Sequence, residues 1–375
     1  MTVAFYAPLK PISSPNPSGD RLIGRMLKKA LEFAGYDVNV VSAFRSYDGK
    51  GDLNRQSRIK AIGQKKAQRL VKQLRHQPPE FWFTYHLYRK APDWIGPVVC
   101  RELGIPYVVA EASFAPSQAQ GKWTVGHHAV AEALSQVNLA VGTTAADEPC
   151  LLPQLGPDTR YRRLKPFIDL APFKDAAASR QGARAALIAE NPISDTVPWL
   201  LTIAMMRPGV KFESYQVLAD ALKRCKHLPW HLLVAGDGPE QEAVRNLFKD
   251  IDDRIVWLGH TSTDETMALY AACDVFAWPS VRESPGMVFL EAQASGLPVV
   301  GGNGGSVSDV IEHGCGGFLA EIRNAEDFAS HIRSLLTNEA QRRKMGQSAI
   351  AFVKSNHSLE IAAGVLKDEL SELRP

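Results

Sequence analysis

Residues 278–300 read WPSVRESPGMVFLEAQASGLPVV, and this stretch decides the fold of the second half of the chain. An apolar strand ends at Trp278, and a loop containing proline follows it. A short helix of small and apolar residues then leads to a second apolar strand after Gly296. Gly286 falls at the expected start of the helix, and Gly296 falls at its expected end. The order strand, loop, helix, strand predicts a parallel βαβ unit.

Two carboxylates, Glu283 and Glu291, stand eight residues apart in this stretch. We expect Glu283 just before the helix and Glu291 about two turns further on. The free backbone N–H groups of a helix start form an anion site, and Gly286 leaves room beside it. The same spacing also occurs on solvated helix faces. The glycine-rich loop at 301–305 favours a nucleotide-sugar site, with one acid on the sugar and the other on a ribose.

Length and composition describe an ordinary globular protein of two domains. The chain has 375 residues, 45% of them hydrophobic and 22% charged. A net charge of only +3 gives no global attraction to nucleic acid. The five cysteines are odd in number and widely separated, which argues against a zinc site or a disulfide framework. Since neither a membrane span nor a signal-peptide pattern is visible, we expect a cytoplasmic protein.

Apolar strands alternate with helical stretches along nearly the whole chain, which predicts α/β architecture with two doubly wound, Rossmann-like domains facing across a cleft. A proline-punctuated, alanine-rich region at 165–198 separates the two halves. The expected strands of the first half are 3–7, 37–41, 81–85, 107–110 and 139–142, and its helices are 20–34, 55–76, 95–103 and one from about 126. The expected strands of the second half are 199–204, 231–235, 254–258, 275–278 and 298–301.

These motifs, in this order, resemble the retaining nucleotide-sugar glycosyltransferases of the GT-B fold, in particular the large family four (glycosyl transferases group 1). The residues from Glu283 to Ala292 resemble the family's Glu-x7-Glu signature, and the segments LPVV, GG, IEHG and GFL that follow resemble its continuation. The segment PFID at 166–169 is similar to the family's interdomain stretch. The resemblance implies a first domain at 1–165, a linker and domain entry at 166–198, and a nucleotide-sugar domain at 199–355. A C-terminal helix within 356–375 would pack back on the first domain.

The resemblance implies that Arg207 and Lys211 hold the donor diphosphate and stabilise the departing nucleotide, as cationic groups do in phosphate chemistry. The sequence departs from the family pattern here, because the two cations are closer together than usual and Phe212 replaces a glycine. The alternative is a pair of exposed loop cations. Beside them, the resemblance places the diphosphate on the amides of Gly286 and Met287, the ribose on Glu291 and the donor sugar on Glu283.

Three further positions are expected near the donor. Gly19 would let a loop of the first domain approach the phosphates, and the absence of a Gly-x-Gly-x-x-Gly pattern there argues against an NAD enzyme. Gly236 would shape the nucleotide site, although a tight turn alone also explains it. Leu258 lies where such proteins cradle the base, and an ordinary strand end is the alternative.

The acceptor side has three candidates. The family often carries a histidine after the fourth strand, where this chain has Glu111. His86 or His127 would take its place, with Glu111 as a polar group for the acceptor. A single histidine is otherwise more often structural or solvated.

The resemblance implies transfer of a hexose-type sugar from a nucleotide-diphosphate donor with retention, by front-face departure in which the leaving diphosphate takes the acceptor proton. No Asp-x-Asp follows a strand, so we expect no metal and no cofactor beyond the donor. The acceptor would be a sugar or a lipid-linked molecule. The alternatives are an epimerase or hydrolase of the same fold, or a non-catalytic nucleotide-sugar-binding protein.

A basic stretch at 50–75 holds nine lysines and arginines against one acid, Asp52. Its apolar residues recur at near-helical spacing, as on a surface helix with solvated lysines. The alternative is a patch that docks the protein on anionic lipid at the inner membrane face.

Overall fold

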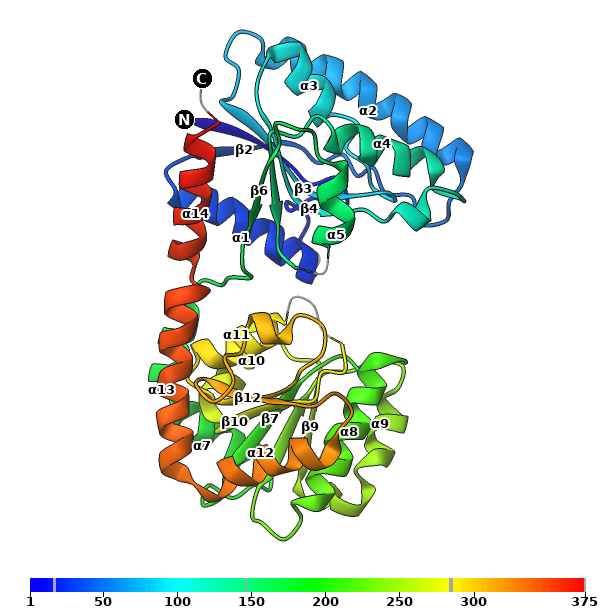
Figure 1. The fold of residues 1–375 in the computed structure, drawn as a ribbon. Coiled ribbons are helices and arrows are strands. Elements are labelled where there is room, and N and C mark those ends of the chain that lie inside the picture. Colours follow the sequence, from blue (N-terminus) through cyan, green and yellow to red (C-terminus); the bar gives the residue numbers. More distant parts are fainter. Residues whose placement is uncertain (16–17, 146, 283–285, 374–375) are drawn as a thin grey trace. The chain divides into compact units, whose positions relative to one another are not determined.

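The computed structural model describes residues 1–15, 18–145, 147–282 and 286–373, which form two compact units (Figure 1). Unit 1 comprises Met1–Lys165 and Leu359–Pro375, and unit 2 comprises Pro166–Ser358. Each unit is a parallel sheet with helices on both faces, so the expected α/β class with two doubly wound domains is confirmed.

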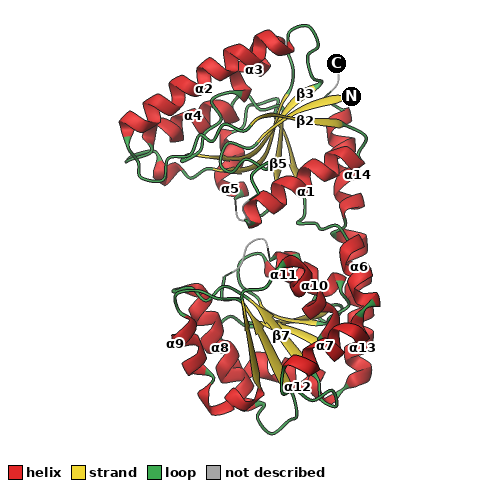
Figure 2. Cartoon of the chain, turned by 180° about the vertical axis from the view of Figure 1, so that it is seen from behind, coloured by secondary structure: helices red, strands yellow, loops and turns green. Residues whose placement is uncertain are grey.

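The sheet of unit 1 has the strand order β2-β1-β3-β4-β5-β6. The helices α1 and α14 contact each other on one face, and α2 contacts α3 and α4 on the other (Figures 1 and 2). The strands are β1 (Thr2–Tyr6), β2 (Asp37–Ser42), β3 (Phe81–Tyr88), β4 (Tyr107–Ser113), β5 (Leu139–Gly142) and β6 (Arg160–Arg163). The helices are α1 (Gly19–Phe33), α2 (Leu53–Leu74), α3 (Gly96–Leu103), α4 (Thr124–Leu134), α5 (Glu148–Leu151) and α14 (Leu359–Ser371).

The sheet of unit 2 has the order β12-β11-β10-β7-β8-β9. The helices α8 and α12 contact each other, while α10 contacts α6 and α7, and α11 contacts α13. The strands are β7 (Trp199–Ile203), β8 (His231–Ala235), β9 (Ile255–Gly259), β10 (Val275–Trp278), β11 (Val299–Gly302) and β12 (Gly317–Ala320). The helices are α6 (Ala171–Ala178), α7 (Arg180–Glu190), α8 (Val210–Arg224), α9 (Gln241–Leu247), α10 (Thr263–Ala272), α11 (Met287–Ala294), α12 (Ala325–Thr337) and α13 (Glu339–Asn356).

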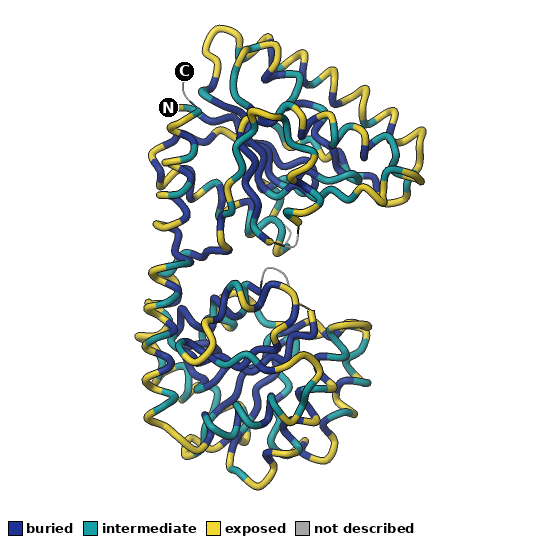
Figure 3. Tube along the Cα trace, in the orientation of Figure 1, coloured by how far each residue is buried: buried dark blue, intermediate teal, exposed yellow. Residues whose placement is uncertain are grey.

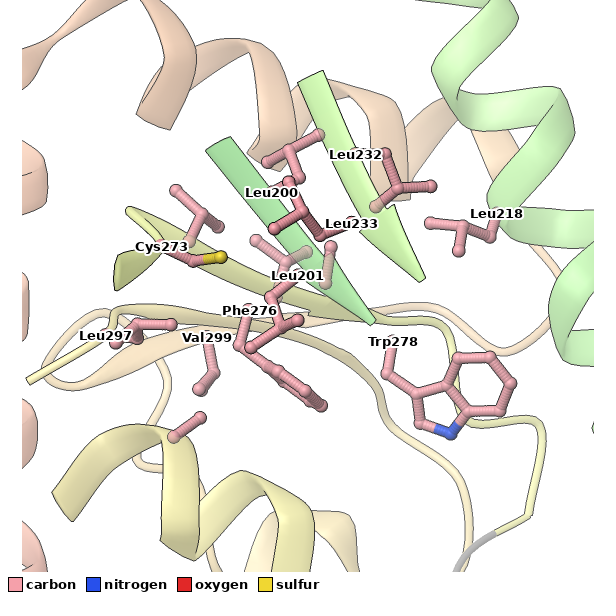
Figure 4. Packing of buried hydrophobic residues seen from close by; sticks show 14 of the residues in the cluster. Leu200, Leu201, Leu218, Leu232, Leu233, Cys273, Phe276, Trp278, Leu297 and Val299 are labelled. Atoms are coloured by element: carbon pink, nitrogen blue, oxygen red, sulfur yellow. The ribbon is translucent and has the colours of Figure 1, made fainter. Parts of the chain in front are cut away.

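The core of each unit lies along its central strands, which are buried on both faces (Figure 3). In unit 2 the leucines of β7 and β8 pack with Phe276 and Val299 of the neighbouring strands, and Trp278 stands at the end of β10 (Figure 4). Continuous apolar strands of this kind are typical of parallel sheets covered by helices. The loops that follow these strands therefore start from a rigid base.

Two features were not among the sequence-based expectations. The strands β6, which reads RYRR, and β12, which reads GFLA, were not expected. Residues 166–198, expected as linker and domain entry, lie within unit 2, where α6 and α7 pack on α10 and Phe173 is buried. The last helix, α14, begins at Leu359 and lies within the range expected for it.

Helix α14 packs on α1 within unit 1, and its buried side chains include Leu366 and Leu370. Arg160 of β6 pairs with Glu369 and Glu372 at the end of this helix, with N–O distances of 2.8 and 2.7 Å. The C-terminal residues thus complete the first unit. Within the described ranges, no helix is long and apolar enough to cross a membrane.

Candidate active site

The loops after β7 and β10 mark the ligand-binding edge of unit 2. These two strands are neighbours in the sheet, but the chain proceeds from β7 towards β9 and from β10 towards β12, so the strand order reverses between them. In open parallel sheets, ligands bind at the carboxyl ends of the strands where the order reverses. The candidate donor residues Arg207, Lys211, Gly286 and Met287 all follow these two strands.

Lys211 lies in the first turn of α8, and its Nζ lies 5.3 Å from the centroid of the Trp278 ring. Trp278 is fully buried at the end of β10, and Tyr215 packs edge-on against it. The Tyr215 hydroxyl donates a 2.8 Å hydrogen bond to the carbonyl of Ala204 after β7. The Lys211 ammonium group, which follows β7, therefore lies beside a ring at the end of β10. The strand order reverses between these two strands.

Arg207 is exposed in the loop before α8. Among the described residues its guanidinium group has no hydrogen bond, ion pair or ring contact. Arg207 precedes α8 by three residues, and Lys211 lies in the first turn of that helix, so both cations lie at this edge of the sheet. Of the two, Lys211 contacts a neighbouring aromatic ring.

Gly286 is the N-cap of α11 and has a φ of 74°, a left-handed conformation that favours glycine. A Cβ at this position would lie 3.2 Å from Val310 Cγ2. Met287 is the first helical residue, so its amide is among those that point out of the helix start. Glu283, expected on the donor sugar, lies outside the described residues.

Glu291 lies in the middle of α11, and its Oε2 accepts a 2.8 Å hydrogen bond from the hydroxyl of Tyr270 in α10. Burial raises the pKa of the Glu291 carboxyl, and the Tyr270 hydroxyl partly opposes that rise. Tyr270 is itself fully buried, with its ring against Phe173 and Phe276. Sequence reasoning missed Tyr270, because no spacing links it to Glu291.

Gly236 and Gly238 hold the loop after β8 against the loop after β7. Their φ values are 134° and 150°, and a Cβ on Gly236 would stand only 2.0 Å from the carbonyl oxygen of Ala204. The amide of Met206 donates to the carbonyl of Asp237 at 2.7 Å. The turn expected at Gly236 thus positions the chain that leads to Arg207. Leu258, expected near the base, is partly exposed in β9.

Unit 1 has an equivalent edge between β1 and β3, where its strand order reverses. Gly19 begins α1 after β1, and a Cβ there would meet nothing within 4 Å. Asp20 follows it, and its Oδ1 lies 2.6 Å from Nδ1 of His86 at the end of β3. On the next strand, β4, the carboxylate of Glu111 accepts a hydrogen bond from the Thr143 hydroxyl. The structure thus places Gly19, His86 and Glu111 at one edge of unit 1.

His127 is different, because it is a buried residue of α4. Its Nε2 lies 3.1 Å from the carbonyl oxygen of Ala115, and its ring packs on Phe114 with centroids 4.5 Å apart. These contacts indicate a structural histidine, so of the two histidines expected to replace the family's residue, His86 has the more suitable position.

No group of three or more His, Cys, Asp or Glu residues that could hold a metal ion occurs in the part of the chain that the structure describes. Its five cysteines are all free.

Comparison with known proteins agrees with this arrangement. The chain is similar along nearly its whole length to a glycosyltransferase from Rickettsia africae, with a TM-score of 0.77, 16% identity, and 99% and 98% of the two chains covered. It is similar also to the Anabaena protein HepE, solved in complex with UDP and glucose, with a TM-score of 0.65, 18% identity, and 98% and 99% covered. The architecture is therefore the GT-B fold of glycosyltransferases.

Residues 188–352, a little under half of the chain, match the family model described as glycosyl transferases group 1. A curated relative is the GDP-mannose-dependent alpha-(1-6)-phosphatidylinositol monomannoside mannosyltransferase of Mycobacterium tuberculosis, 28% identical over 227 residues, which are 57% of each chain. The chain thus spans little more than half the length of this relative in the match.

Proposed function

We propose that the protein is a retaining glycosyltransferase that moves a hexose-type sugar from a nucleotide-diphosphate donor to a sugar or lipid-linked acceptor. The observation that carries this proposal is the edge of unit 2 between β7 and β10. The strand order of the sheet reverses between these two strands. The Lys211 ammonium group follows β7, and the start of α11 and the Glu291 carboxyl group follow β10. Relatives whose names include GDP-mannose, and a similar structure with bound UDP, support a nucleotide donor.

Each group has a distinct role in this proposal. Lys211 and the amides of Gly286 and Met287 bind the diphosphate, since a helix start and an ammonium group both stabilise phosphate charge. Glu291, held by Tyr270, accepts hydrogen bonds from the ribose hydroxyls. Arg207, exposed on the loop before α8, stabilises the nucleotide as it departs. Glu283 binds the donor sugar.

We propose a front-face, metal-independent reaction. The C1–O bond of the donor breaks, and its electron pair passes to the leaving diphosphate. The acceptor oxygen forms the new bond on the same face and gives its proton to a diphosphate oxygen. Cationic and amide groups that stabilise a departing diphosphate lower the barrier to such a step without a protein nucleophile.

The test is turnover of a panel of nucleotide hexoses with monosaccharide, polyol and lipid-linked acceptors, followed by NMR of the anomeric proton. We expect a product with the anomeric configuration of the donor, formed at the same rate with and without chelator. An inverted product would contradict retention. Activity lost to the chelator and restored by magnesium or manganese would contradict metal independence, and release of free epimerised sugar without transfer would replace the proposal with an epimerase or hydrolase.

We propose in addition that α2 docks the enzyme on anionic lipid. Its buried stripe includes Gln56, Gly63, Ala67 and Val71 and faces the rest of unit 1. Among its exposed cations, four have no ion pair or ring contact with any described residue: Arg58, Lys65, Arg69 and Lys72. Ile62 is 41% exposed beside them. Each cation near an anionic surface contributes about 1 kcal/mol of binding.

Vesicle flotation at low salt tests this docking. The protein should float with phosphatidylserine-rich vesicles and remain unbound with pure phosphatidylcholine. Changing these four cations to glutamine should abolish flotation. A control with the same loss of charge elsewhere, in exposed residues of α13 and α14 (Arg343, Lys344, Lys354 and Lys367 to glutamine), should leave it intact. Equal flotation of both variants would refute a role for α2.

A further inference from the structure

Two neighbouring strands of unit 1 adopt left-handed backbone at the same level. His86 of β3 has a φ of 63°, and Glu111 of β4 has a φ of 57°. The ladder between these strands pairs Tyr85 with Ala110 and resumes two residues later, so His86 and Glu111 stand opposite each other in the interruption. Non-glycine residues with such φ values cluster at active sites and ligand-binding segments, where the surrounding structure holds them in place.

Asp20 of α1 fixes the orientation of the His86 ring on β3. Burial works against ionisation of Asp20, but the hydrogen bond and charge of His86, with the charge of Lys10, bring the pKa of its carboxyl below the ordinary value. An ionised carboxylate can only accept, so Nδ1 of His86 carries the hydrogen in the 2.6 Å contact. In the neutral ring, Nε2 is then an acceptor for a hydroxyl group.

Asp20 differs from a carboxylate that serves only the fold. Asp93, buried in the same unit, accepts hydrogen bonds from the hydroxyls of Thr84 and Tyr107 and from two backbone amides at the start of α3. In Asp20, by contrast, the Oδ2 atom is buried and has no hydrogen-bond partner among the described residues. Asp20 therefore keeps one carboxylate oxygen that can accept a hydrogen bond from a further donor.

Carboxyl groups lie close to His86. The ionised Asp20 carboxylate accepts a hydrogen bond from its ring, and Glu111 stands opposite it in the strand ladder. Burial raises the pKa of the Glu111 carboxyl, and the charges of Asp20 and Asp147 raise it further, while the Thr143 hydroxyl and His86 oppose the rise. Lys10 is a lysine whose charge acts on Asp20. A phosphomonoester would be repelled, whereas the hydroxyl groups of a sugar or polyol would find carboxylate and imidazole acceptors.

We propose that His86 and Glu111 select the acceptor, and that they take a neutral, hydroxyl-bearing group in preference to a phosphorylated one. Asp20 is the positioning residue of His86. This inference rests on the proposed function and on the acceptor-side candidates expected in unit 1. It sets the chain apart from matched relatives whose names specify a phosphorylated substrate, such as the D-inositol 3-phosphate glycosyltransferases.

The first test uses the full chain with its active donor and matched acceptors, glucose against glucose 6-phosphate and myo-inositol against its 3-phosphate. The kcat/KM for the neutral acceptor of each pair should be at least about tenfold higher, because one hydrogen bond gained or one charge repelled changes the binding constant by about this factor. His86→Asn, which keeps a residue tolerant of left-handed backbone, and Asp20→Asn should each raise the KM for the neutral acceptor about tenfold, with kcat little changed. Glu111→Gln should shift preference towards the phosphorylated acceptor.

Matched controls separate this role from a loss of structure. His128→Asn and Glu102→Gln change exposed residues of the same types in unit 1, and both should behave as the unmodified protein. Stabilisation by nucleoside diphosphate should be the same in all five variants, because Lys211 and Glu291, the side chains proposed to bind the nucleotide, lie in unit 2.

The second test reads His86 directly by nitrogen-15 NMR of the histidine side chains. The ring should carry its hydrogen on Nδ1 in the unmodified protein, and this signature should disappear in Asp20→Asn. Adding myo-inositol should shift the Nε2 signal, and adding inositol 3-phosphate at the same concentration should not.

The results distinguish two kinds of failure. Nucleotide binding together with a preference for the phosphorylated acceptors, or with an unchanged KM in His86→Asn and Glu111→Gln, would overturn only the selection proposed here. Absence of nucleotide binding and of transfer would overturn the proposed function. The NMR titration would then still decide whether His86 binds neutral polyols.

Discussion

The contact between Tyr270 and Glu291 orients a carboxyl group that is proposed to bind the donor. The two side chains come from different helices, and the hydroxyl of the fully buried tyrosine donates to the carboxylate at 2.8 Å. This hydrogen bond holds the Glu291 carboxyl group in one orientation. Burial raises the pKa of that carboxyl, so folding changes how readily Glu291 ionises.

Replacing Glu291 by glutamine should therefore alter how stability depends on pH. A carboxyl whose pKa is raised on folding binds its proton more tightly in the native state, so its contribution favours folding below the unfolded pKa and is lost as pH rises through the folded value. As the pH rises from about 4, the ordinary range of an unfolded glutamate, towards the raised folded pKa, the unmodified protein should lose stability relative to Glu291→Gln. Melting temperatures of both proteins across this range check the sign.

The exposed Glu102 of α3 provides the control, since Glu102→Gln should follow the unmodified protein at every pH. A difference between Glu291→Gln and the unmodified protein that stays constant with pH would mean that Glu291 titrates alike in the folded and unfolded states.

At the same scale, the sequence indicates which residue types are present but not which of them meet. The loop of Lys211 and the helix start at Gly286 follow from strand and turn signals, and both lie at the expected edge of unit 2. The partners Trp278, Tyr270 and Asp20 depend on which strands and helices become neighbours, and no local pattern encodes that. The roles expected for Glu283, Arg207 and Lys211 stay predictions.

At the scale of elements, the loops after β7 and β8 are joined backbone to backbone. The amide of Met206 donates to the carbonyl of Asp237 at 2.7 Å, and the amide of Glu240 donates to the carbonyl of Met206 at 3.0 Å. This close approach requires that Gly236 has no side chain and a φ of 134°. The loop that carries Arg207 and leads to α8 is therefore held in place by a glycine of the neighbouring loop.

Gly236→Ala should destabilise the protein by more than about 2 kcal/mol and weaken nucleotide binding, because the new Cβ meets a carbonyl oxygen in a strained conformation. The same substitution at Gly182, exposed in α7 with nothing within 4 Å of a new Cβ, should stabilise by about 0.5–1 kcal/mol. Chemical denaturation and nucleotide titration measure both effects. Equal stability of the two variants would show that the close backbone approach has no energetic role.

Helix and strand bounds at this scale follow the sequence closely where apolar runs and turn residues coincide. The helix expected at 20–34 is α1 at Gly19–Phe33, and the strand expected at 231–235 is β8. The strand β6 escapes prediction because its residues, RYRR, resemble a polar loop, and only pairing with β5 makes it a strand. Tertiary contacts decide such segments.

At the scale of the whole molecule, the chain builds two units of the same architecture, and each carries its candidate residues where its strand order reverses. Alternation of strands and helices is sufficient to predict this class of fold. It does not predict that α6 and α7 belong to unit 2, since their alanine-rich sequence has few large apolar side chains and their place depends on α10. Nor does it identify the donor base or the acceptor.

The central claim is that unit 2 binds a nucleotide-sugar donor through Lys211 and Glu291, and thermal unfolding with a panel of UDP, GDP, ADP and their sugars tests it most directly. A ligand at one hundred times its dissociation constant stabilises the native state by about 2.7 kcal/mol. We predict a shift with one nucleotide family that is lost in Lys211→Ala and Glu291→Gln and kept in Lys174→Ala, an exposed lysine of α6. No shift with any nucleotide, or the same shift in all three variants, would contradict the claim.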